Sequence, residues 1–204
     1  MSGRDLIFFD LGSVVCRFYP GRRLAAIAAA TGLAEPEIRA RIWGSGLDDD
    51  MDRGRYSLDE ACRAVADALG RPIARDTLLD AWAKAWDSDP DVLEIVDALR
   101  RDRRRTAMLS DNGPLLLATL PQHFPELPPR FEPLCFSSEL RAVKPTPECF
   151  ARALERAGVD PERAVLIDDL PENAEGARAH GLEGIVFTGA GDLRRALARL
   201  GIAG

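Results

Sequence analysis

The residues of this chain best suited to chemistry are polar side chains that directly follow short apolar runs. Asp10 ends the first such run, and Ser110 ends the second. The pair Asp168-Asp169 ends a later run, and Lys144 lies in the connection ahead of it. A carboxylate in such a place can act as a nucleophile or bind a metal ion, while a hydroxyl and an ammonium group can hold an anion beside it. These side chains come from distant parts of the chain, so the fold must bring them together.

Strands are the elements that can position them. Five apolar runs are too short for helices and are typical of buried strands: residues 6–9, 106–109, 134–136, 164–167 and 184–187. Helical patterns separate the later runs, which predicts an α/β fold, a doubly wound parallel sheet of about five strands with helices on both faces. In an open parallel sheet, ligands bind outside the carboxyl ends of the strands. The polar side chains are therefore expected to converge on one crevice at that edge.

One interval breaks the alternation of strands and helices. Roughly seventy residues follow the first strand without a convincing strand among them, which is too long for an ordinary connection. They carry helical patterns at residues 22–31, at 36–43, after the capping box that begins at Ser57, and at 78–86. We therefore expect a Rossmann-like core of residues 1–15 and 89–204, with an all-helical cap domain of residues 16–88 above the carboxyl edge of the sheet.

The composition narrows the class of protein. The chain has 204 residues, of which 46% are hydrophobic and 29% charged, as in an ordinary soluble globular protein. A net charge of -6 without a basic stripe argues against nucleic acid as a partner. The sequence contains neither a secretion signal nor an apolar stretch long enough for a membrane span, so we expect a cytoplasmic protein that does not enter a membrane.

Four motifs make the chain resemble the haloacid dehalogenase superfamily of aspartate-nucleophile hydrolases, in the subgroup with a helical cap after the first strand. Phe9-Asp10-Leu11-Gly12 resembles the first motif, Leu109-Ser110 the second, Val143-Lys144-Pro145 the third, and Asp168-Asp169 with Asn173 the fourth. The resemblance covers nearly the whole chain. Its Asp-Leu-Gly beginning is similar to a branch that includes bacterial sugar-phosphate phosphatases acting on glucose 1-phosphate.

The resemblance implies a Mg²⁺-dependent phosphatase that hydrolyses a small phosphate monoester, such as a sugar phosphate. Asp10 would attack phosphorus and form an aspartyl-phosphate, which water then hydrolyses. Ser110 and Lys144 would act with it in catalysis, and both would bind the transferring phosphate together with Asn112. The implied partner is a small phosphorylated metabolite. The sequence names neither the leaving alcohol nor the oligomeric state.

The same resemblance implies one Mg²⁺ ion bound by hard oxygen ligands. Asp10 and Asp169 would supply carboxylate oxygens, and the backbone carbonyl of Gly12 would supply a third ligand without any side chain. Asp168 is assigned to the same metal site, where it would support the direct ligands without being one of them. Water and a phosphate oxygen would complete the octahedron around the ion.

Two positions depart from the family pattern. Most phosphatases of this superfamily have an aspartate at position 12 that protonates the leaving group and activates water, and Gly12 can do neither. Loss of such general acid–base help typically costs about 10²–10⁴ in rate, so we expect a cap residue or water to take over, or a substrate with an easier leaving group. Asp111 stands where many relatives have asparagine, and we expect its carboxylate to point away from the phosphate.

Specificity is expected to lie in the cap. Trp43 and Arg53 flank the acidic run of residues 48–52, which we interpret as an exposed loop. An arginine there could contact the polar end of a substrate. The alternative interpretation is structural, with Trp43 in the core of the cap and the arginines paired with the acids.

Other functions stay open at this point. A metal-independent 2-haloacid dehalogenase needs no proton for its leaving halide, but Asp10, Asp168 and Asp169 would then repel one another without a cation. A phosphomutase would need the missing acid–base residue at position 12. A degenerate member that only binds a phosphorylated ligand would not need Asp10, Lys144 and Asp169 together. A hydrolase of phosphate esters is therefore the favoured hypothesis.

Overall fold

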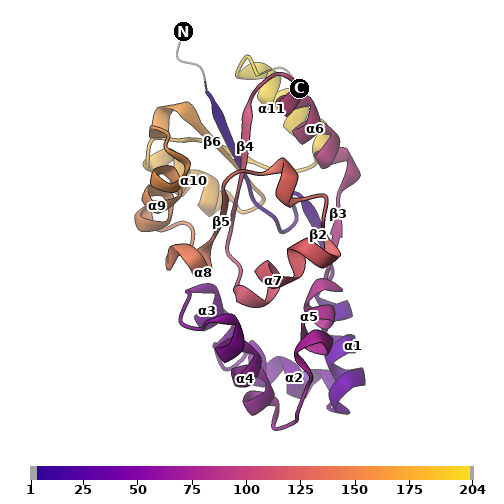
Figure 1. The fold of residues 1–204 in the computed structure, drawn as a ribbon. Coiled ribbons are helices and arrows are strands. Elements are labelled where there is room, and N and C mark those ends of the chain that lie inside the picture. Colours follow the sequence, from indigo (N-terminus) through magenta and orange to yellow (C-terminus); the bar gives the residue numbers. More distant parts are fainter. Residues whose placement is uncertain (1–3, 203–204) are drawn as a thin grey trace.

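A central parallel sheet forms the core of the fold. The computed structural model describes residues 4–202, and its five-stranded sheet has the order β5-β4-β1-β6-β7 with every neighbouring pair parallel (Figure 1). The strands are β1 (Leu6–Phe9), β4 (Arg105–Ser110), β5 (Leu134–Phe136), β6 (Ala164–Asp168) and β7 (Glu183–Val186). Because β1 lies between β4 and β6, the chain winds outward from it in both directions. The predicted fold class and the five predicted strands are confirmed.

Alternate side chains of β1 serve the two faces of the sheet. Leu6 and Phe8 belong to one buried cluster, whereas Ile7 and Phe9 belong to the other. The first cluster is covered by α8 (Ser137–Leu140), α9 (Pro147–Ala157) and α10 (Pro171–Ala179), and the second by α6 (Pro90–Arg101), α7 (Pro114–His123) and α11 (Ala190–Arg199). The short 3-10 helices η1 (Pro128–Arg130) and η2 (Pro161–Arg163) precede β5 and β6. The strand ends are thereby backed by packed side chains on both faces.

The long segment between β1 and α6 is mostly helical, with helices where the sequence predicts them. It contains α1 (Pro20–Thr31), α2 (Glu35–Ile42), α3 (Leu47–Asp52), α4 (Leu58–Leu69) and α5 (Arg75–Ala83). The predicted capping box begins α4, because the Ser57 hydroxyl accepts from the Glu60 N–H while the Glu60 carboxylate accepts from the Ser57 N–H at 2.8 Å. These helices lie beyond the carboxyl ends of the strands, at the lower end of the molecule in Figure 1. No helix within residues 4–202 is long and apolar enough to cross a membrane.

Two short strands contradict the expectation that this segment contains none. β2 (Cys16–Phe18) pairs antiparallel with β3 (Trp86–Ser88), with Phe18 opposite Trp86. Trp86 therefore lies in a strand and not at the end of the fourth predicted helix. Each strand has three residues and is held by a partner far along the chain, so it is too short to show a period in the sequence. The pair forms both connections between the helical segment and the sheet.

The acidic run of residues 48–52 also differs from its expectation. It is not an exposed loop but most of α3, in which Met51 is fully buried in the core. Asp48 and Asp52 are four residues apart, so both carboxylates project from the same face of this helix. The exposed-loop interpretation is wrong because it rests on the charges alone. It does not take into account that Met51 is apolar and that Asp48 and Asp52 have helical spacing.

Candidate active site

The polar strand ends line a cavity of about 370 Å³ between the carboxyl edge of the sheet and the helical segment. From the sheet side come Asp10, Gly12, Asp111, Asn112, Lys144, Asp168 and Asp169, and from the segment of residues 16–88 come Arg23, Trp43, Asp48, Asp52, Trp82 and Trp86. Two of the predicted site residues, Ser110 and Arg53, are not among the lining residues. The structure therefore brings together side chains from distant strands at the edge where they were expected to meet.

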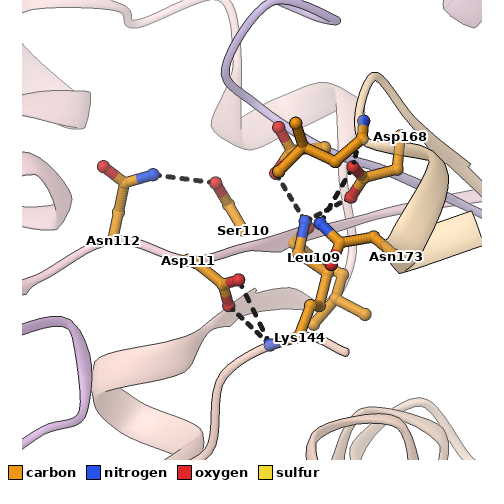
Figure 2. Close-up of polar contacts among 9 residues, drawn as sticks. Leu109, Ser110, Asp111, Asn112, Lys144, Asp168 and Asn173 are labelled. Carbon is orange, nitrogen blue, oxygen red and sulfur yellow. Dashed lines mark hydrogen bonds and ion pairs between the residues drawn. The ribbon is translucent and has the colours of Figure 1, made fainter. Parts of the chain in front are cut away.

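Lys144 is the centre of a buried charge network. Its Nζ donates to Asp10 Oδ1 at 2.8 Å, to Asp168 Oδ2 at 2.6 Å and to the backbone carbonyl of Leu109 at 3.1 Å (Figure 2). All three donors of the ammonium group are therefore used. Burial alone lowers the pKa of Lys144, but the negative charges of Asp10 and Asp168 outweigh burial and raise that pKa above its ordinary value. Lys144 is accordingly a permanent cation at the end of β1.

The two carboxylates that accept from Lys144 differ in whether their second oxygen is also hydrogen-bonded. The second oxygen of Asp168 accepts from the Leu170 N–H and from Asn173 Nδ2, both at 3.0 Å. The Asp10 side chain is 11% exposed, against 1% for Asp168, and no donor within residues 4–202 bonds its second oxygen. Burial raises the pKa of Asp10 to about 6, although Lys144 lowers it. Asp10 thus has one oxygen open to the cavity, whereas Asp168 anchors the lysine.

The loop after β4 is arranged differently from what the sequence predicts. Ser110 is fully buried, and its hydroxyl accepts from Asn112 Nδ2 at 2.9 Å (Figure 2). Asn112 itself is among the residues that line the cavity. Asp111 is among the lining residues too, and the expectation that its carboxylate points away from the phosphate stays a prediction. Both of its oxygens accept from the backbone N–H of Lys144 at 3.1 Å. A bond to the backbone of Lys144, 33 residues along the chain, thus decides where Asp111 lies.

The structure gives a reason for the glycine at position 12. A Cβ added to Gly12 would lie 3.2 Å from the ring of Trp86, which is closer than ordinary van der Waals contact. Trp86 belongs to β3, at the far end of the helical segment. The space that a side chain at position 12 would use is therefore filled by an aromatic ring from the segment that covers the cavity.

The residues at this edge fit a magnesium ion. Proteins usually hold Mg²⁺ with one or two carboxylates, completed by water and substrate phosphate. Asp10 and Asp169 line the cavity beside Gly12, whereas Asp168 is committed to Lys144. Residues 4–202 contain no cluster of three or more acidic, histidine or cysteine side chains that could hold a metal. The assignment of two carboxylates and a backbone carbonyl as the protein ligands stays a prediction.

Acidic side chains outnumber basic ones around the cavity. Its lining contains six aspartates but only Arg23 and Lys144 as cations. Burial raises the pKa of Asp111 and of Asp169, and burial together with the charge of Asp48 raises the pKa of Asp52 to about 8. An anionic ligand would be repelled from this cavity unless a cation accompanied it.

Arg23 is a candidate functional residue that sequence reasoning missed. It lies in the first turn of α1, lines the cavity and is only 4% exposed. Its guanidinium carbon lies 4.4 Å from the centre of the Trp82 ring and 5.7, 5.8 and 5.9 Å from the rings of Phe18, Trp86 and Trp43. Its Nε and Nη2 atoms are buried without a hydrogen-bond partner in the described part of the chain. Arg23 is thus a buried cation inside an aromatic box.

One signal in the sequence could have identified Arg23. It precedes the fully buried Ile27 by four residues, so both side chains lie on the same face of α1. Long charged side chains are almost never fully buried unless they have partners. An arginine in register with the apolar face of a helix is therefore a candidate for a functional role.

The two cap residues predicted from the sequence lie in different environments. Trp43 lines the cavity and donates from Nε1 to Asp48 Oδ2 at 2.8 Å. Arg53 is exposed and does not line the cavity. Its neighbour Arg55 pairs with Asp50 at 2.7 Å, as the structural interpretation of these arginines expects. The arginine that faces the cavity therefore comes from α1 and not from the acidic run.

The sequence matches one protein family over most of its length. The family model for haloacid dehalogenase-like hydrolases matches residues 4–181. A D-ribitol-5-phosphate phosphatase from Bacteroides thetaiotaomicron is 25% identical over 184 residues, which cover 87% of this chain and 88% of that protein. A phosphatase from Mycobacterium tuberculosis is 27% identical over 200 residues, which cover 95% of this chain and 91% of that protein.

The fold has close counterparts among solved structures. A crystal structure of a haloacid-dehalogenase-family enzyme from Bacteroides thetaiotaomicron superposes with a TM-score of 0.78 at 20% identity, over 96% of this chain and 98% of that one. The same enzyme in complex with magnesium and inorganic phosphate superposes with a TM-score of 0.73 at 20% identity, over 89% and 93% of the two chains. At this identity the likeness concerns the fold.

Proposed function

Because this chain belongs to the haloacid dehalogenase-like hydrolases, we propose that it is a Mg²⁺-dependent phosphatase of a small phosphate monoester, with a sugar phosphate as the favoured substrate. The family and the phosphatase relatives make it a hydrolase of phosphate esters. The observation that carries the finer proposal is the buried network of Asp10, Lys144 and Asp168 at the cavity. This network leaves one oxygen of Asp10 open to the cavity, beside the ammonium group of Lys144 that holds the other oxygen.

Asp10 is the proposed nucleophile. A bond forms between one of its oxygens and the phosphorus of the ester, while the bond from phosphorus to the alcohol oxygen breaks. Water then attacks the phosphorus of the aspartyl-phosphate, which releases inorganic phosphate and restores the carboxylate. Its pKa of about 6 leaves Asp10 mostly ionised at neutral pH, as a nucleophile must be.

Lys144 is proposed to orient Asp10 and to stabilise the transferring phosphoryl group. Because Asp168 accepts from both Lys144 and Asn173, the ammonium group is held in place as negative charge shifts on the phosphoryl oxygens. Asn112 lines the cavity and is assigned a direct phosphate contact. Ser110 orients the Asn112 amide, and its own contact with phosphate remains a prediction that requires this amide to turn aside.

Asp10, Asp169 and the backbone carbonyl of Gly12 are the groups that would hold Mg²⁺, with Asp168 supporting them through Lys144. When bound, the ion supplies positive charge that lets a phosphate ester approach a cavity lined by six aspartates. The surplus of carboxylates supports this assignment because Lys144 and Arg23 cannot balance them alone.

Residues 16–88 are proposed to act as a cap domain that selects the leaving alcohol. Displacement in line with Asp10 places the alcohol on the opposite side of the phosphorus, which is the side of this helical segment. Position 12 has no acid, and the Trp86 ring lies against it, so we expect the leaving oxygen to take its proton from a cap residue or from water. Gly12 thus limits the rate of proton transfer without affecting attack by Asp10.

The rival hypothesis is hydrolysis of a 2-haloacid without a metal. It agrees with Gly12, because a leaving halide needs no proton. The six aspartates around the cavity argue against it, since a haloacid is itself an anion and nothing else would offset their repulsion.

A single assay distinguishes these functions. Release of inorganic phosphate is measured over a panel of sugar phosphates, other phosphate esters and nucleotides with Mg²⁺, and halide release is measured over 2-haloacids. We expect phosphate release that stops in excess EDTA and in the Asp10→Asn variant. Full activity in EDTA, or halide release in its place, would overturn the proposal.

A further inference from the structure

We infer that Arg23 and Asp52 form a subsite for the hydroxyl groups of a neutral, polyhydroxylated leaving alcohol. The inference rests on the proposed phosphatase function and names the class of substrate that its cavity selects. Both side chains line the same cavity as Asp10, and both come from the helical segment on the leaving-group side.

Arg23 has buried hydrogen-bond donors without an acceptor, as expected of a side chain that binds a ligand. Its side chain is almost completely buried, yet Nε and Nη2 lack an acceptor in the region that the structure describes. Aromatic rings cover the guanidinium plane, with Trp82 nearest at 4.4 Å, so hydrogen bonds can form only at its edge. Buried donors of this kind are normally paired, and a hydroxyl oxygen in the cavity would supply the missing acceptor.

The charges around Arg23 favour a neutral ligand over an anion. The negative charge of Asp48 acts on Arg23, while burial keeps the proton on Asp52 at neutral pH, so the subsite has no net positive charge. A second phosphate or a carboxylate on the substrate would meet these two acids. A hydroxyl group can accept from Arg23 and donate to Asp52, which an anion cannot do. The pairing therefore fits alcohols that carry several hydroxyl groups.

Asp52 connects this subsite to the phosphate side of the cavity. Its Oδ1 atom lies 3.2 Å from the position that a Cβ on Gly113 would take, directly after Asn112 in the chain. The Ser137 hydroxyl donates to the backbone carbonyl of Asp52 at 2.7 Å and so fixes the end of α3 to the sheet side. An alcohol held by Arg23 and Asp52 is therefore held next to the loop that we assign to phosphate.

The walls of the subsite suit the carbon skeleton of such an alcohol. Trp43 and Trp82 stack with a centroid distance of 5.9 Å, and Trp86 lines the cavity beside them. Sugars and polyols present C–H groups between their hydroxyls, and aromatic faces give these groups apolar contact while the hydroxyls bond Arg23 and Asp52.

The test compares three esters with Mg²⁺: a pentitol phosphate, a phosphoglycerate and phenyl phosphate. We expect kcat/KM for the pentitol phosphate to exceed that for the phosphoglycerate by about tenfold or more. Arg23→Met should lower kcat/KM for the pentitol phosphate about 10- to 100-fold more than for phenyl phosphate, mainly through KM. Asp52→Asn should reduce the discrimination against phosphoglycerate at pH 9, because above its pKa of about 8 Asp52 has lost its proton and carries a negative charge that the amide lacks.

Matched controls lie on the same helices. Arg22→Met changes an exposed neighbour that pairs with Asp87, and Asp49→Asn changes an exposed acid of α3, so both should behave as the wild type. Equal losses on pentitol phosphate and phenyl phosphate in Arg23→Met would overturn the inference, because a merely structural role would affect both. A wild-type preference for phosphoglycerate would overturn it as well, by indicating an anion site.

Binding separates this inference from the proposed function. The pentitol phosphate is titrated calorimetrically into the Asp10→Asn protein with Mg²⁺, with and without Arg23→Met. If no ester is hydrolysed but binding is found and depends on Arg23, the phosphatase proposal fails and the subsite is supported. If Arg23→Met leaves binding unchanged, or no binding occurs, the subsite is wrong.

Discussion

The buried cations on the two sides of the cavity differ in their hydrogen bonding. On the sheet side, Lys144 donates to Asp10, to Asp168 and to a backbone carbonyl, so each of its donors has an acceptor. On the helical side, Arg23 is buried to a similar extent, but two of its nitrogen atoms lack a partner among the residues described. Both cations line the same cavity, and only one is fully paired without a ligand.

The difference indicates which half of the site is complete in advance. A buried donor without an acceptor costs about 1–3 kcal/mol, a cost that a bound ligand can relieve. The sheet side is preorganised because attack on phosphorus is the same for every ester. The helical side is left for the ligand to complete, and it can therefore distinguish one alcohol from another.

The largest expected effect is on kcat, which should fall when the proposed nucleophile is replaced but not when Arg23 is replaced. Asp10→Asn should lower kcat by about 10⁴-fold or more, because an amide cannot replace the carboxylate nucleophile. Arg23→Met should affect mainly KM. The measurement is phosphate release with Mg²⁺ at saturating ester, with thermal unfolding to verify that both variants fold. If Arg23→Met lowered kcat as strongly as Asp10→Asn, the division between the two sides would not hold.

The second prediction concerns stability. Lys144→Met leaves two buried carboxylates without their cation, and breaking a buried ion pair costs about 3–5 kcal/mol of unfolding free energy. Arg23→Met removes a cation with unpaired donors from an aromatic box, so the loss should be under about 1 kcal/mol. Urea unfolding at neutral pH measures both values. Equal losses would contradict the contrast between a paired and an unpaired cation.

The third prediction concerns the contact where the two sides meet. Gly12→Ala places a methyl group against the Trp86 ring, where its Cβ would lie 3.2 Å away, and should cost about 1–3 kcal/mol of stability. Gly21→Ala is the matched control, because nothing lies within 4 Å of its added Cβ and it lies in α1. Trp86→Phe should recover part of the loss in Gly12→Ala. No recovery would mean that the ring is not what excludes a side chain.

The smallest expected effect is a pH dependence of stability on the helical side. The folded protein keeps the proton of Asp52 up to its pKa of about 8, whereas the unfolded chain loses it near the ordinary value of 3.8. Between these values the folded state binds the extra proton, so this group lowers the unfolding free energy as pH rises.

Asp52→Asn should therefore raise the Tm at pH 8 more than at pH 5. Asp49→Asn, an exposed change on the same helix, serves as the control. The difference between the two variants is followed by thermal unfolding from pH 4 to pH 9. It should grow up to about pH 8 and then become constant, because both states are ionised above that pH. A difference that is independent of pH would contradict the burial of this acid.

Sequence reasoning succeeds where the physical signal is local. Buried parallel strands need continuous apolar residues, so short runs such as residues 6–9 and 164–167 predict β1 and β6 correctly. The capping box at Ser57 predicts the start of α4, because it involves only groups three residues apart. Even the arginine in register with Ile27 gives a local signal, although its meaning depends on what packs against α1.

Sequence reasoning fails where position depends on distant contacts. β2 and β3 exist because Phe18 pairs with Trp86, which lies at the other end of the helical segment. The Ser110 hydroxyl accepts from Asn112, and the Asp111 carboxylate accepts from the backbone of Lys144, 33 residues along the chain. A motif specifies the types of these residues without specifying which atoms they contact.

The sequence by itself determined the strands, most of the helices and the edge of the sheet at which Asp10, Lys144 and Asp168 gather. These features follow from periodicity and from the parallel order of the strands, which nearby residues encode. Only the tertiary structure decided that Lys144 is fully paired, that Trp86 fills the space beside Gly12 and that Arg23 is buried without an acceptor. Those outcomes depend on packing between residues far apart in the chain, and packing exists only once the fold has formed.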